Sequence, residues 1–325
     1  MLQVYIIRRL AQLPPTLVVI SIVVFIAVRM LPGDTALLLS LNHQTGQEAT
    51  SIAQAEIDEL RSSLGLNDPW HIQYVRWSRD MLTLDLGRSP ISGRDILSEI
   101  LRKAPVTLEL ASFATLFALV PGLPAGIVSA VKRDTRTDYL IRIVSLAGVA
   151  LPHFWLGTII ILVGLILFTW APPIEYMDFT RSPIDHLTQL SIPAVILGYS
   201  AGAIVARVTR SSLLEVLGED YIRTARAKGL KTSTILHRHA LRNALLPVVT
   251  ITGLVFTGLI SGSIIMEQLF GLPGLGLYLL DGIRLRDYGV IQALVLLFSI
   301  SIMLINLVVD ISYVLIDPRI SRTLK

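Results

Sequence analysis

Long apolar runs are the feature of this sequence that most restricts its fold. They cover Leu10–Met30, Val106–Val131, Tyr139–Ala171, Ile192–Val208, Leu245–Met266 and Gly289–Ile316. Each is close to the roughly 20 residues that a helix needs to cross a bilayer core of about 30 Å. With 53% hydrophobic and 16% charged residues, the chain is also too apolar for an ordinary soluble domain. We therefore predict an all-α integral membrane protein.

The number of crossings depends on the run from Tyr139. It is long and contains Pro152, so it can form one kinked span or two half-spans. One crossing places four basic segments in the cytoplasm, as the positive-inside rule requires; they are "MLQVYIIRR", "KRDTRTD", residues 218–247 and "DPRISRTLK". No small-residue cleavage site follows the first run, which favours a retained first span. We therefore predict six spans with both termini in the cytoplasm.

The domain organisation follows from these spans. We expect a first span and an extracytoplasmic helical segment at 1–105, a transmembrane core at 106–316 with a cytoplasmic loop at 211–244, and a cytoplasmic tail at 317–325. In the outer segment, residues 57–64 have the apolar spacing of one helical face. Trp70, Tyr74 and Trp77 repeat at helical spacing, which favours packing or an interfacial position over contact with a substrate.

A basic insert, "GEDYIRTARAKGLKTSTILHRHALRNALLP" at 218–247, separates two of the apolar runs. Acids in its first turn favour a helix over 219–228, and Gly229 is suited to end that helix. A second helix then carries small and apolar residues on one face, namely Leu236, Ala240 and Ala244. This compact form fits a groove on a partner protein. The alternative is a loop that rests on anionic lipid.

The sequence shows no motif for catalysis or energy conversion. It has no phosphate-cradling loop, no serine nucleophile elbow, no zinc-binding histidine pair and no cysteine. Only His237 and His239 are close in sequence, and they point to different helix faces. We expect a chain without enzymatic activity, metal or other cofactor, and without a nucleic-acid partner.

Ionisable residues inside the apolar runs are few. Glu109 and Arg142 lie near span ends, where they can reach the interface or pair with neighbours. Asp310 lies deeper and shares a helix face with Asn306. Such groups commonly join helices, and no continuous chain of them forms a proton relay. We expect a structural contact between Asp310 and Asn306, while an ion-coupled secondary transporter remains an alternative.

Segments spread over nearly the whole chain resemble the membrane permeases of bacterial ABC importers, in the dipeptide/oligopeptide/nickel branch. They are "RMLPGDTA" at 29–36, "LGLNDPWHIQYVRW" at 64–77, "LDLGRS" at 84–89, "DYIRTARAKGL" at 220–230, "HALRNALLPV" at 239–248, "EQLFGLPGLG" at 267–276 and "DPR" at 317–319. Each is weak alone, but their ordered combination is specific. The chain is most similar to the first of the two permease subunits of oligopeptide importers.

The resemblance implies the type I ABC importer permease fold in the bacterial inner membrane. This chain would form half of a peptide translocation pathway. Its partners would be a second permease, two cytoplasmic ATPases that bind Mg-ATP, and an extracytoplasmic peptide-binding protein. Nickel or another small solute remains an alternative, although the lack of a His/Cys cluster favours peptides. A membrane scaffold without transport activity is a further alternative.

The resemblance also suggests functional residues in the insert. In this family a cytoplasmic loop of pattern E-A-A-x-x-x-G docks on the ATPase. Alignment on Gly229 places Arg223, Thr224 and Ala225 at the E-A-A positions, so the glutamate is absent. Ala225 and Gly229 therefore carry over, and we add Asp220, Arg223 and Lys228 as exposed neighbours.

The segment "EQLFGLPGLG" resembles an outward re-entry segment of the family. Its candidate outer-gate residues are Glu267, Gly271, Pro273, Gly274 and Gly276. An ordinary outer loop is the alternative, because glycine and proline mark turns anywhere.

Overall fold

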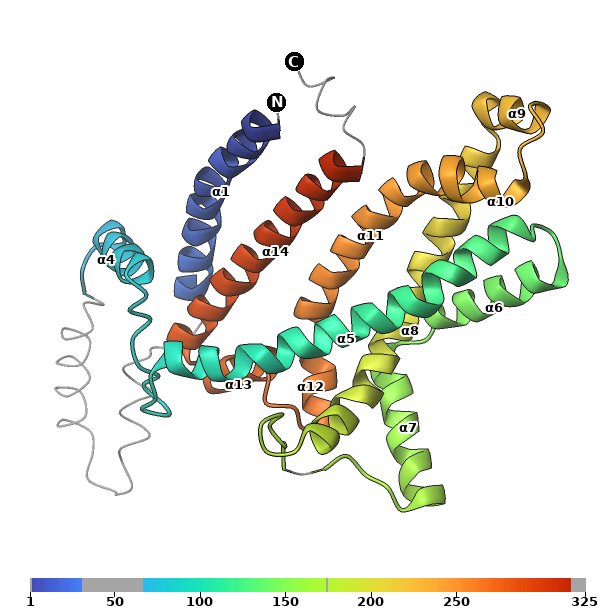
Figure 1. Cartoon of the computed structure of the whole chain (residues 1–325). Helices are drawn as coiled ribbons and strands as arrows, with labels where there is room; N and C mark the ends of the chain where they lie inside the picture. The colour runs from blue at the N-terminus through green and yellow to red at the C-terminus, as the bar shows by residue number, and fades with distance from the viewer. Residues whose placement is uncertain (1, 31–66, 174, 317–325) are drawn as a thin grey trace. The chain divides into compact units, whose positions relative to one another are not determined.

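A computed structural model of the chain describes residues 2–30, 67–173 and 175–316 (Figure 1). Within these ranges the ordered elements are helices, together with one isolated bridge between Arg88 and Asp95. The all-α prediction is therefore confirmed for the described residues. The helix expected at 57–64 and the tail at 317–325 lie outside them.

Five helical segments are long and apolar enough to cross a membrane. They belong to α1 (Leu2–Met30), α5 (Ile96–Val131), α8 (Pro183–Leu217), α11 (Leu241–Gly262) with the turns before it, and α14 (Tyr288–Ile316). Two bent helix pairs raise the number to as many as seven. They are α6 (Arg136–Ala150) with α7 (His153–Phe168), and α12 (Ile264–Phe270) with α13 (Leu275–Leu285). The predicted six spans count the first pair as one crossing.

The predicted break in the run from Tyr139 is present. Helices α6 and α7 are bent by 95° relative to each other. Leu151 ends α6 in an extended conformation, and Pro152 precedes the first residue of α7. Proline lacks the amide hydrogen that would continue the helical ladder. Neither helix alone has the roughly 20 residues required for a crossing.

The chain divides into two compact units, which we describe separately. The first contains residues 1–10, 106–276 and 302–325, and the second contains residues 11–105 and 277–301. In the first unit, α8 packs against α6, α7 and α11 (Figure 1).

Small residues allow α5 and α8 to approach closely. A Cβ atom on Gly122 would lie 2.7 Å from the carbonyl oxygen of Gly202. One on Gly198 would lie 2.7 Å from the carbonyl oxygen of Ala114. Close backbone approach through small residues is typical of helix packing in membranes.

In the second unit, α4 (Trp70–Leu82) packs through the predicted aromatic stripe. The rings of Tyr74 and Trp77 lie 5.5 and 5.7 Å from the ring of Phe25, and the hydroxyl groups of Tyr74 and Ser21 are 2.8 Å apart. The packing prediction is confirmed for Tyr74 and Trp77, whereas Trp70 remains 58% exposed.

Candidate functional site

The basic insert forms the predicted helix, glycine turn and second helix. Helix α9 (Asp220–Ala227) ends at Lys228, and Gly229 has φ +78°. The amide of Gly229 donates a hydrogen bond to the carbonyl of Arg226 at 2.9 Å, and the amide of Leu230 donates one to the carbonyl of Ala225 at 3.3 Å. These two bonds form a Schellman motif, in which a glycine in the left-handed region satisfies the last carbonyl groups of a helix. The role of Gly229 as helix terminator is therefore confirmed.

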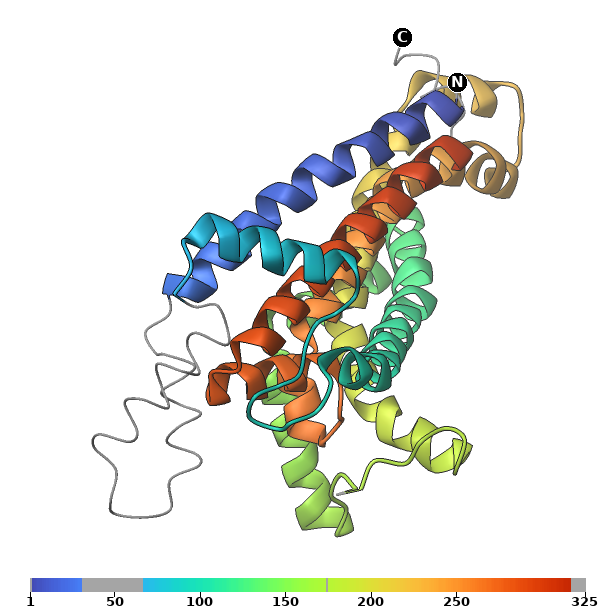
Figure 2. The same ribbon diagram turned by 90° about the vertical axis from the view of Figure 1, so that its left-hand side faces the viewer.

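The second helix begins with α10 (Thr232–Thr234) and the π-helical turn η1 (Ile235–Ala240), which continue into α11. In both views α9 and α10 lie together where α8 ends and α11 begins (Figure 2). The amide group of Asn243 also donates a hydrogen bond to the hydroxyl of Tyr221 at 2.9 Å. The insert is thus tied to the helices on both sides of it.

A buried apolar cluster holds the insert in place. It joins the ends of α5, α8 and α11 to α9 and η1, through Ala130, Leu213, Ile222, Ala225, Ile235, Ala240 and Ala244. The predicted apolar face of the second helix is confirmed, because Ala240 and Ala244 are fully or almost fully buried. Tight packing of this kind transmits displacement, since cores of native density have low compressibility.

The cluster corrects the position expected for Ala225. We expected Ala225 to offer close backbone approach to a partner, but its side chain is 8% exposed and packs inside the chain's own cluster. Asp220, Arg223, Lys228 and Gly229 are exposed. The outward surface of α9 and of the turn after it therefore includes these four residues but not Ala225.

The segment at 267–276 is organised around a buried carboxylate. Glu267 is fully buried, and its Oε1 accepts hydrogen bonds from the hydroxyls of Thr107 and Ser263, both at 2.8 Å. The same Thr107 oxygen accepts a hydrogen bond from the amide of Leu275 at 2.8 Å. Thr107 thereby fixes both ends of the segment to α5.

The glycines of this segment serve two different purposes. Gly271 ends α12 with φ +65°, which a side chain would disfavour. Gly274 leaves room for the carboxylate, because a Cβ atom there would lie 2.5 Å from both oxygens of Glu267. A Cβ atom on Gly276 would lie 3.0 Å from Oε2. The candidate gate residues thus form one packed turn, and Pro273 lies between its glycines.

Glu109 is paired with His186 in the first turn of α8. Its carboxylate lies 2.8 Å from Nε2 of His186, and Nδ1 of His186 contacts the carbonyl of Met177 at 3.0 Å and the hydroxyl of Tyr176 at 3.2 Å. Burial raises the pKa of Tyr176 to about 12, and the nearby charges of Glu109 and Asp178 act in the same direction. Tyr176 therefore stays protonated at physiological pH.

The contact expected between Asp310 and Asn306 is not the one observed. Asp310 instead forms an ion pair with Arg9 of α1 at 3.1 Å, and Asn306 is exposed. A shared face within one helix showed where Asp310 points, but it gave no information about the neighbouring helix. Asp310 therefore makes a contact between helices, as expected, but its partner is Arg9 and not Asn306.

Sequence reasoning missed the ion pair of a buried carboxylate. Asp138 is fully buried at the start of α6, and Arg210 of α8 donates to both of its oxygens, at 2.9 and 2.8 Å. The hydroxyl of Ser129 and the amide of Asp134 also donate to this carboxylate. The Ser/Thr-x-x-acid spacing of "TRTD" at 135–138 marks the start of α6, but it does not indicate Arg210 as the partner of Asp138.

Comparisons with known proteins agree with this geometry. Residues 122–322 match the family described as binding-protein-dependent transport system inner membrane component, and residues 1–111 match the corresponding N-terminal family. Among the described residues, no group of three or more His, Cys, Asp or Glu side chains is suited to hold a metal ion.

Relatives match over almost their full length. The glutathione transport system permease protein GsiC of Escherichia coli O6:H1 is 41% identical, with 97% of this chain and 98% of the relative covered. A putative peptide transport system permease protein of Brucella melitensis biotype 1 is 36% identical, with 98% and 99% covered. An inward-facing structure of the MetNI methionine ABC transporter shares the fold, with a TM-score of 0.52 at 19% identity over 70% of this chain and 96% of that chain. The chain therefore belongs to the family of inner-membrane components of binding-protein-dependent transport systems, as an ABC importer permease of the branch that its motifs predict.

Proposed function

We propose that this permease carries peptides, as half of the translocation pathway of an ATP-driven importer. The names of its relatives, a glutathione transport permease and a putative peptide transport permease, support a peptide substrate. The second half would come from a similar permease around a pseudo-two-fold axis. An extracytoplasmic binding protein would deliver the peptide.

The observation that supports a coupling role is the way α9 packs against the ends of the membrane helices. Its outward residues are exposed, while its inward residues Ile222 and Ala225 belong to the cluster that joins the ends of α5, α8 and α11. A push on α9 would therefore act on three membrane helices at once. Only a partner contact that differs between two states can shift their equilibrium.

We infer that the partner at α9 is a cytoplasmic ATPase, with one ATPase for each of the two permeases. Mg-ATP would be bound by the ATPases and not by this chain. Both termini and the insert would then lie on the cytoplasmic side, as the basic segments suggest.

Substrate uptake tests the proposal. The complex is reconstituted in vesicles with its binding protein. It should transport radiolabelled glutathione or a labelled tripeptide only when ATP is supplied on the side of the membrane that carries the ATPases. Labelled Ni²⁺ is the competing substrate of the same branch. ATP-dependent accumulation of Ni²⁺ without peptide transport would contradict the proposed substrate, and uptake driven by a proton gradient without ATP would contradict the mechanism.

A further inference from the structure

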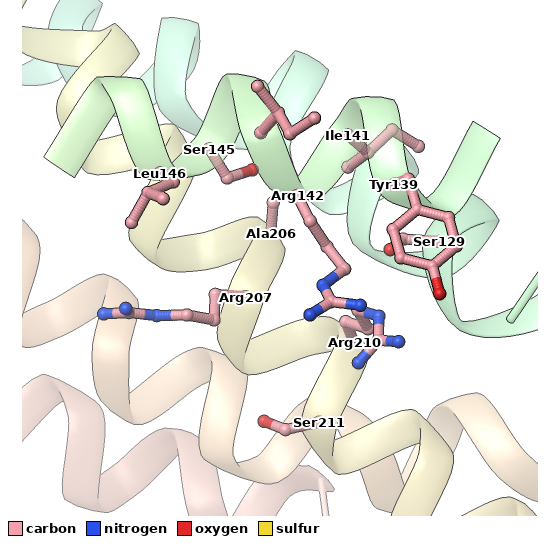
Figure 3. A pocket seen from close by; sticks show the side chains of 11 residues that line it. Ser129, Tyr139, Ile141, Arg142, Ser145, Leu146, Ala206, Arg207, Arg210 and Ser211 are labelled. Atoms are coloured by element: carbon pink, nitrogen blue, oxygen red, sulfur yellow. The ribbon is translucent and has the colours of Figure 1, made fainter. Parts of the chain in front are cut away.

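A pocket of about 400 Å³ between α6 and α8 is lined by three arginines (Figure 3). Arg142 reaches into it from α6, and Arg207 and Arg210 come from the last turns of α8. The hydroxyl-bearing residues Ser145 and Ser211 also line it. The pocket lies entirely within the first compact unit and is separate from the insert and from the segment at 267–276.

The pocket has more positive charge than the chain compensates. Asp138 neutralises Arg210 through two hydrogen bonds. The guanidinium group of Arg142 lies 5.5 Å from the ring centre of Tyr139, and within the described part of the chain neither Arg142 nor Arg207 has an acidic partner. Two guanidinium groups are thus uncompensated. Arg207 lies in α8, which is long and apolar enough to cross a membrane, and Arg142 lies in α6, which meets the same criteria only together with α7. Cations in such helices are costly unless an anion or water meets them.

The rest of the lining suits an amphiphile better than a soluble ion. Tyr139, Ile143 and Leu146 line the pocket, yet they are 52%, 64% and 65% exposed. Apolar side chains exposed beside the arginines suit contact with acyl chains. Arginine binds phosphate oxygens through two parallel N–H donors.

We propose that this pocket binds the phosphate of an anionic phospholipid, with Arg142 as its ligand and the apolar residues of α6 against its acyl chains. The side chain of Arg207 extends to the opposite side of the pocket and adds positive charge beside the phosphate (Figure 3). Basic pockets between membrane helices on the cytoplasmic side recognise lipid head groups in this way. The choice of leaflet rests on the proposed orientation, whereas lipid binding itself does not.

The test is native mass spectrometry of the assembled complex, titrated in detergent with short-chain phosphatidylglycerol. Arg142→Gln and Arg207→Gln should each raise the lipid concentration at half-saturation by about fivefold, the contribution of one basic residue near an anionic surface. Arg136→Gln is the matched control, because Arg136 begins α6 and is exposed outside the pocket. The Arg136→Gln variant should give the same phosphatidylglycerol titration as the native permease. Phosphatidylcholine should bind to the native permease and to all variants to the same extent.

Three results would overturn the proposal. The first is equal phosphatidylglycerol binding by the Arg142, Arg207 and Arg136 variants. The second is displacement of the lipid by glycerol phosphate at the same concentration, which would identify a soluble phosphate ligand. The third is loss of the second permease from the Arg207→Gln complex, which would identify a protein carboxylate as its partner. Neither ATP hydrolysis nor uptake enters this measurement, so its failure leaves the import proposal unaffected.

Discussion

Arg210 holds the carboxylate of Asp138 with two parallel hydrogen bonds, although 72 positions separate the two residues in sequence. Asp138 lies in the first turn of α6, shortly after the loop that follows α5, and Arg210 lies in α8 shortly before the insert. The pair therefore joins α6 to α8, the helix that leads into the proposed coupling element.

Asp138→Asn should destabilise the permease strongly. The change removes one partner of a buried ion pair and leaves Arg210 uncompensated, at a cost of about 3–5 kcal/mol. The measurement is the midpoint of thermal unfolding of the purified complex. Arg133→Gln is the control, because Arg133 and Asp134 form an exposed pair with both side chains 66% exposed, worth at most about 1 kcal/mol. Equal midpoints for the two variants would show that the Asp138 pair contributes no more than a surface pair.

Gly274→Ala should disrupt the turn around Glu267. The new methyl group would lie 2.4 Å from the carboxyl carbon of Glu267, and overpacking of this kind costs about 1–3 kcal/mol. Gly258→Ala is the matched control, since nothing lies within 4 Å of a Cβ atom there. We expect lower thermal stability and lower peptide uptake for Gly274→Ala alone. Unchanged thermal stability and uptake would mean that the turn can shift to accommodate the methyl group without a loss of free energy.

Arg9 and Asp310 should show a coupling free energy in a double-mutant cycle. The variants Arg9→Gln and Asp310→Asn each break the ion pair at 3.1 Å, whose side chains are 43% and 17% exposed. For such a partly exposed pair we expect a coupling of about 1 kcal/mol in thermal stability. Asn306→Ala combined with Asp310→Asn should be additive. Coupling in the second cycle and none in the first would restore Asn306 as the partner.

The helices and the turns could be predicted because their signals are local. Apolar length gave the spanning helices, Pro152 gave the break between α6 and α7, and the need for positive φ gave the role of Gly229. Each of these depends on a few residues in one stretch of chain. Backbone sterics act on them without reference to the rest of the fold.

The side-chain contacts could not be predicted, because they join distant segments. The hydroxyl of Thr107 meets Glu267 across 160 positions, and periodicity within one helix does not say which helix faces it. Ala225 shows the same limit. Its small size fits contact with a partner or burial in the chain's own cluster, and only the packing of α9 against η1 and α8 distinguishes them.

Cysteine labelling tests the orientation, since the native chain has no cysteine. Single cysteines at the exposed positions Ser233 and Thr180 should react with an impermeant thiol reagent from opposite sides. With six spans, Ser233 should react only from the cytoplasmic side and Thr180 only from outside, because basic segments stay in the cytoplasm. Labelling of Ser233 in intact cells would overturn this orientation.

The outward surface of α9 should determine binding of the ATPase. Charge reversal at Arg223 and Lys228, both exposed, should abolish co-purification of the ATPase while the thermal stability of the permease stays unchanged. Ala225→Trp should behave differently, because overpacking in the buried cluster costs about 1–3 kcal/mol and should lower the stability of the insert itself. Gly229→Val should also destabilise the turn at φ +78°, whereas Gly229→Asn should be tolerated, since asparagine adopts the left-handed region more readily.

A lipid-anchoring insert would give the opposite pattern. Arg238 and Arg242 lie on the second helix and are exposed, so their exchange for glutamine would weaken attraction to anionic lipid without changing the outward surface of α9. We expect this double variant to retain the ATPase and ATP-driven uptake. If it loses uptake while the Arg223 and Lys228 reversal retains it, the coupling role of α9 is wrong, and the basic charge of the insert acts on the membrane instead.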